Sequence, residues 1–98
     1  MNITHALTVA KADATRIERF IARRQRFLDA LDWSMLTEQH ARESAMLDDL
    51  LAGDLADAIL YIDWLEERVA NGVTAVAGVL RFDPHPRPWH AEWIALAA

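Results

Sequence analysis

Four arginines recur at the three-and-four spacing that places residues on one face of a helix: Arg16, Arg19, Arg23 and Arg26. Neighbours at this spacing bring their guanidinium groups into one row. Such a row can bind the carboxylates of an acidic protein or follow nucleic-acid phosphates. It can also be a solvated face whose charge is met by acids of the same chain. Among external partners an acidic protein is favoured over nucleic acid, because the net charge is -5 and aromatic residues are not interleaved as in single-strand binders.

Carboxylates suggest a second chemistry in the acidic half of the chain. Asp63, Glu66 and Glu67 fall on one helical face, as a divalent-metal site requires. This spacing resembles that of all-helical nucleotide pyrophosphohydrolases, which hold Mg²⁺ with paired glutamates on helices. Ala70 stands where a further acid would be needed, so a metal-dependent helical hydrolase is an alternative and not the main prediction.

Other catalytic and ligand signatures are incomplete. The chain has no cysteine and three glycines, and it has neither a nucleophile elbow nor a phosphate-binding loop. The spacing of the four histidines does not define a metal site: His5, His40, His85 and His90. We therefore expect a protein that is not an enzyme and holds neither a metal nor a cofactor.

Large aromatic residues are numerous for 98 residues, and we assign four of them to partner binding: Tyr61, Trp64, Trp89 and Trp93. Each pair lies about one turn apart on its expected helix, and tryptophan and tyrosine are enriched at interface hot spots. The alternative is a core role, which we expect for about half of the tryptophans, since so small a domain rarely buries four.

These residues must be positioned by helices. Apolar residues at steps of three and four predict a long first helix over 7–31, interrupted by Arg24 and capped by Asn2 or Thr4. A break at 32–34 precedes a second helix that reaches residue 51. Gly53 followed by Asp54 predicts a tight corner, and a third helix over 55–70 ends at 71–72.

The third predicted helix is apolar on nearly every side, which indicates that it is either central in the fold or shared with a partner chain. Residues 73–82 suit either a strand or a helix. A lone strand would lack a pairing partner, so we expect a short helix begun by Thr74. We expect residues 83–88 to form a proline-rich connector and a last helix to begin at Pro88.

The sequence thus predicts an all-α fold, a compact bundle of four to five helices with a long N-terminal helix and a proline-tethered C-terminal helix. We expect residues 1–98 to form one domain. The function we expect is a non-enzymatic protein-interaction module, a small inhibitor, adaptor or regulator of a larger assembly, with a profile that fits small acidic phage or mobile-element proteins.

A homodimer through residues 55–70 is also expected, whereas nucleic-acid binding through the arginine face is the other alternative. The start of the chain lacks the pattern of a secretory signal, and no apolar run reaches the roughly 18 residues of a membrane span. We therefore expect a cytoplasmic protein.

Overall fold

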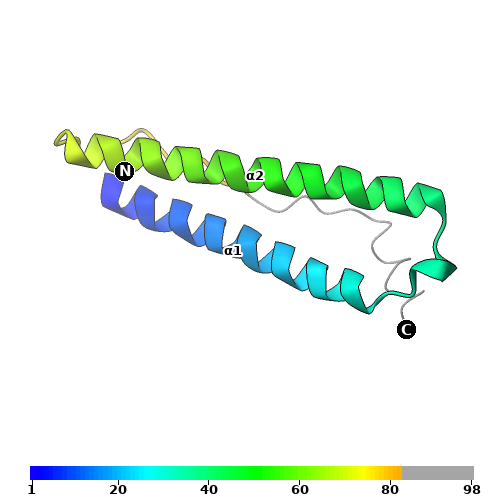
Figure 1. Cartoon of the computed structure of the whole chain (residues 1–98). Coiled ribbons are helices and arrows are strands. Elements are labelled where there is room, and N and C mark those ends of the chain that lie inside the picture. The colour runs from blue at the N-terminus through cyan, green and yellow to red at the C-terminus, as the bar shows by residue number, and fades with distance from the viewer. Residues whose placement is uncertain (83–98) are drawn as a thin grey trace.

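A computed structural model describes residues 1–82, which form a hairpin of two long helices (Figure 1). Helix α1 spans Ile3–Ala30, a 3-10 turn η1 spans Trp33–Met35, and helix α2 spans Glu38–Ala70. The helices lie side by side, and the N-terminus lies beside the end of α2. The all-α class and the long first helix are confirmed. The bundle of four to five helices is wrong, because the described residues contain two α-helices.

The helix ends follow from capping groups present in the sequence. The Asn2 side chain accepts a hydrogen bond from the Thr4 amide at 2.7 Å, which satisfies a donor of the first turn of α1. Thr37 and His40 form a reciprocal capping box at the start of α2. Gly72, with φ of 83°, follows the cap residue at the end of α2. The chain therefore leaves α2 at the place that the sequence predicts.

A repeat of seven residues places the core between the helices. In α1 and just beyond it, the buried positions of this repeat are Ile3, Ala10, Ile17, Arg24 and Leu31. In α2 they are Ser44, Leu51, Ala58 and Leu65. Seven-residue spacing is typical of helices that pack along their whole length as a coiled coil. The described core is thus a single thin seam, without a third element that would close it on both sides.

The predicted corner at Gly53 is absent, because α2 runs through Gly53 and Asp54 without a break. A helix-ending glycine takes a left-handed conformation, and Gly72 is the only described glycine with a positive φ. Leu51 and Ala58 lie seven residues apart on either side of Gly53, and both are buried against α1. Packing along the seam therefore outweighs the cost of about 1 kcal/mol that a glycine brings to a helix interior.

Replacing Gly53 with alanine should raise the free energy of unfolding by about 0.5–1 kcal/mol, because alanine costs less backbone entropy in a helix. A Cβ atom at Gly53 would have no atom within 4 Å, so no clash offsets the gain. Urea denaturation followed by circular dichroism measures the change. Gly72→Ala is the matched control and should lower stability, since Gly72 has a positive φ. A loss of stability in Gly53→Ala would contradict a continuous α2.

Residues 73–82 form an extended arm and not the predicted short helix. A strand was not expected here because it would lack a pairing partner, but the N-terminus of the chain is that partner. The Ile3 amide donates a hydrogen bond to the Thr74 carbonyl at 3.1 Å, and the Val76 amide donates one to the Met1 carbonyl at 2.9 Å. The first amides of α1 have no acceptor within the helix, so Ile3 is free to pair. Val73, Val76 and Val79 pack against the core at this end.

The connector at 83–88 and the predicted helix from Pro88 lie outside the described residues. Among residues 1–82, neither helix is long and apolar enough to cross a membrane.

Candidate interaction surface

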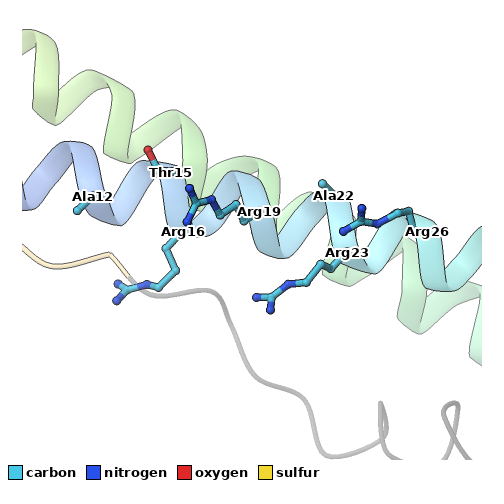
Figure 2. Close-up of a pocket in the computed structure, with 7 residues that line it drawn as sticks. All are labelled: Ala12, Thr15, Arg16, Arg19, Ala22, Arg23 and Arg26. Carbon is cyan, nitrogen blue, oxygen red and sulfur yellow. The ribbon is translucent and has the colours of Figure 1, made fainter.

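The four predicted arginines do form a row on α1, and the row faces away from α2 (Figure 2). They surround a shallow hollow whose other lining residues are Ala12, Thr15 and Ala22. Ten residues separate Arg16 from Arg26, which corresponds to about 15 Å along the helix axis. Arg19, Arg23 and Arg26 are exposed and make no hydrogen bond or ion pair with residues 1–82. We call these four residues the arginine row.

Arg16 differs from the rest of the row because it is tied to the arm. Its Nη2 atom lies 2.9 Å from Asp13 Oδ1 and donates to the Phe82 carbonyl at 3.1 Å. Asp13 also accepts hydrogen bonds from Arg81, at 2.9 and 3.0 Å, and from the Phe82 amide at 3.1 Å. Asp13 is 1% exposed. One buried carboxylate therefore fastens the end of the arm to α1.

The charge of Asp13 follows from these contacts. Burial raises the pKa of its carboxyl, but the hydrogen bond from Arg81, the Phe82 amide and the charges of Arg81 and Arg16 together outweigh burial and hold the pKa below its ordinary value. The group is therefore an anion at neutral pH. Its oxygens already accept four hydrogen bonds, so its role in this arrangement is to position the arm.

Arg24 forms a second internal polar cluster, within the seam between the helices. Its Nη2 donates to the Ser44 carbonyl at 3.1 Å and to the Ser44 hydroxyl at 2.7 Å, while Nη1 pairs with Asp48. Arg24 is 8% exposed, whereas the side chain of Asp48 is 59% exposed. The arginine that interrupts the apolar pattern of α1 is thus held by α2, and it is not part of the arginine row.

Tyr61 and Trp64 share one face of α2, as the spacing predicts. Their rings stack with centroids 6.0 Å apart, and the guanidinium carbon of Arg68 lies 4.1 Å above the Trp64 ring. The Tyr61 hydroxyl accepts a hydrogen bond from the Leu80 amide at 3.1 Å, so this ring serves the arm. Trp64 remains 44% exposed. The pair and the arginine row line different hollows, on different helices.

Trp89 and Trp93, the other predicted partner-binding residues, lie outside the described residues. Trp33 is described and 43% exposed, and its indole N–H donates to the Leu28 carbonyl at 3.2 Å. A core role for this ring is thus only partial.

Carboxylates and histidines of the described part do not gather into a metal site. No group of three such ligands occurs among residues 1–82. Of the three acids considered for a hydrolase, Glu66 lies 3.2 Å from the Lys11 ammonium. His40 accepts a hydrogen bond from the Thr37 amide at 3.1 Å and so belongs to the helix cap.

Two features of this surface were missed by sequence reasoning. Asp13 lies between Ala10 and Ala14 in the apolar stripe of α1, and a charged residue at that position signals an internal partner as clearly as Arg24 does. The other feature is an apolar groove between the helices, lined mainly by residues of α2. In the sequence, this groove is indicated by the pair of small residues Ala52 and Ala56 beside larger apolar ones.

Comparison with protein-family models, curated proteins and solved structures gave no significant match to this chain.

Proposed function

We propose that this protein is a non-enzymatic interaction module that binds an acidic surface of a larger protein assembly through its arginine row, as a small inhibitor, adaptor or regulator. The observation that carries the proposal is the position of Arg19, Arg23 and Arg26. They are exposed on the face of α1 remote from α2, with no carboxylate partner among residues 1–82.

The row is unfavourable for the isolated hairpin. Like charges three and four residues apart on a helix repel by about 0.2–0.5 kcal/mol per pair. Arg24 and Arg16 show that α1 can place arginines beside carboxylates of its own chain, yet the other three have no such contact with residues 1–82. A bound row of carboxylates would remove the repulsion and form charge-assisted hydrogen bonds.

Charge and lining favour a protein partner over nucleic acid. The chain carries a net charge of -5, which opposes approach of a polyanion as long as a nucleic acid. The described residues that line the hollow between the arginines are Ala12, Thr15 and Ala22, so residues 1–82 supply no aromatic ring there on which a base could stack. A row of about 15 Å matches roughly three turns of an acidic helix.

The test is affinity capture from a lysate of the source cells with the wild-type chain and with Arg19→Glu/Arg23→Glu. Reversal of both charges should reduce capture of the partner by at least about 100-fold, which is roughly 3 kcal/mol of binding energy. Bound proteins are quantified by mass spectrometry, with nuclease added to one half of each sample. Arg42→Glu/Arg68→Glu is the matched control, since it changes the net charge equally but lies on α2.

The proposal is supported if a protein is retained by the wild-type and control chains, lost from the Arg19/Arg23 variant and released by salt. Equal retention by all three chains, or no retention by any, contradicts it. Capture of nucleic acid, or of proteins that nuclease treatment removes, replaces it with the nucleic-acid alternative.

A further inference from the structure

An apolar groove runs between the helices on the flank that the arm leaves uncovered. Ile21, Leu51 and Leu55 line it together with Ala52, Ala56 and Ile59, and Asp48 is the one charged lining residue among residues 1–82. Leu55 and Tyr61 lie three residues before and after the buried Ala58, so they fall on opposite sides of the seam. The arm occupies the Tyr61 side through the bond to Leu80. Within the described part of the chain, the groove is therefore open on the other side.

The groove is suited to an uncharged, apolar occupant. Asp48 pairs with Arg24 of the same chain, so its charge is already met within the hairpin. Leu51 at the floor is 2% exposed, while Ile59 at the rim is 45% exposed. A charged partner would find no counter-charge here, whereas burial of the apolar lining would stabilise a complex. The occupant must present a surface of the same apolar kind.

The shape of the hairpin provides the area that an identical copy needs. The structure measures 56 × 20 × 19 Å, and its radius of gyration is 17.3 Å. A compact domain of this length would have a radius of about 13 Å. One long side of the hairpin covers about 1,100 Å², from its length and width, against the roughly 800 Å² that each partner buries in a stable interface.

The groove also carries both halves of a self-complementary contact. Ala52 and Ala56 leave a hollow, and Ile59 stands out from the same face of α2. A two-fold axis crossing α2 between Leu55 and Ala56 places Ile59 of each copy against Ala52 of the other. Such a contact is isologous, as two-fold dimers require, and small residues let the helix axes approach to about 8 Å.

We propose that two copies of this protein associate through this groove, with α2 packed antiparallel on α2, to form a four-helix bundle. The second copy closes the flank of the seam that one hairpin leaves open. The proposal also accounts for the apolar residues Leu55 and Ile59, which line the groove and are not fully buried within one chain. It does not rest on the arginine row, which lies on another face of α1.

The mass of the full chain in solution tests the dimer. Sedimentation equilibrium of the wild type at about 50 μM should give twice the chain mass of 11.1 kDa. Ala56→Glu should weaken the dimer at least about 100-fold and yield a monomer, because two carboxylates would meet near the axis. Met46→Glu is the matched control. It adds the same charge to α2 at a position that is 62% exposed, outside the groove lining and remote from the axis, so the dimer should persist.

An introduced cysteine gives a second readout that does not depend on weakening the contact. The chain has no cysteine, so Ala56→Cys places one thiol near the axis, and mild oxidation should link it to its copy within minutes. Met46→Cys, at an exposed position outside the groove lining, should remain unlinked under the same conditions. A wild type that is monomeric, a larger oligomer, a dimer unaffected by Ala56→Glu, or equal linking of both cysteine variants overturns the proposal.

Salt separates this proposal from the proposed function. Apolar association persists at about 0.5 M salt, where binding by the arginine row is screened. Arg19→Glu/Arg23→Glu should therefore remain dimeric, and Ala56→Glu should retain the arginine row. Loss of the dimer would therefore contradict this proposal alone, and loss of salt-sensitive partner binding would contradict the proposed function alone.

Discussion

Asp13→Asn is expected to lower the free energy of unfolding by about 2–3 kcal/mol, because hydrogen bonds to a buried charged group contribute about 1.5–3 kcal/mol. The amide cannot accept all four bonds now made by Asp13, and its NH₂ group would face the donors of Arg81 and Arg16. Those arginine side chains are 55% and 44% exposed, so water replaces part of the loss. Urea denaturation measures the change.

The same substitution should release the arm, and hydrogen exchange of the Leu80 and Phe82 amides reports this directly. Both amides are bonded in the wild type, to Tyr61 and to Asp13 respectively. Asp29→Asn is the control, since Asp29 is exposed and its one hydrogen-bond partner among residues 1–82 is Gln25. Unchanged stability together with unchanged exchange in Asp13→Asn would show that the carboxylate does not hold the arm.

Acid should reproduce the effect of the substitution. The pKa of Asp13 is lowered in the folded chain, so the unfolded chain takes up the proton more readily. The contribution of Asp13 is therefore complete above its ordinary value of 3.8 and is lost as pH falls below that value through the lowered pKa. Unfolding measured between about pH 6 and 2 should be less pH-dependent in Asp13→Asn than in Asp29→Asn. If the free energy of unfolding depended equally on pH in the two variants, a group other than Asp13 would cause the acid sensitivity.

The course of α1 and the C-terminal end of α2 were predictable from local chemistry. Apolar residues at steps of three and four defined the buried face of α1, and its capping by Asn2 was foreseen as one of two choices. The error at Gly53 arose because a local glycine signal was weighed above the seven-residue spacing of Leu51, Ala58 and Leu65. That spacing continues unchanged past Gly53, and it was the better guide. The free-energy cost of one glycine in a helix is smaller than the stability that would be lost if a layer of the core were not packed.

The arm could not be predicted in the same way, because its partners are distant in sequence. Ile3 and Thr74 are joined by a backbone hydrogen bond, and Arg81 of the arm donates a hydrogen bond to Asp13 of α1. Local propensity carries no information about such contacts, whereas a charge within an apolar stripe does indicate that a distant partner exists. The arginine row was predicted correctly in its geometry, since helical spacing alone determines it. Its binding role remains a prediction.

Arg23 and Arg24 are adjacent in sequence, and charge reversal should separate their roles sharply. Arg24→Glu is expected to lower the free energy of unfolding by about 3–5 kcal/mol, as loss of one partner from a buried ion pair does. The new carboxylate would face Asp48 and the Ser44 carbonyl at a position that is 8% exposed. Arg23→Glu makes the same change of charge on an exposed side chain without a partner among residues 1–82, and stability should stay close to that of the wild type.

Urea denaturation of the two variants, with circular dichroism to follow helix content, measures this difference. Arg24→Met is the third member of the series. An apolar side chain of similar length fills the seam and leaves Asp48 solvated, so it should recover most of the stability that Arg24→Glu loses. If Arg23→Glu proved as destabilising as Arg24→Glu, the arginine row would be needed for folding, and its exposure would no longer argue for a partner. Stable folding of Arg23→Glu is therefore the condition under which a loss of binding can be assigned to the surface itself.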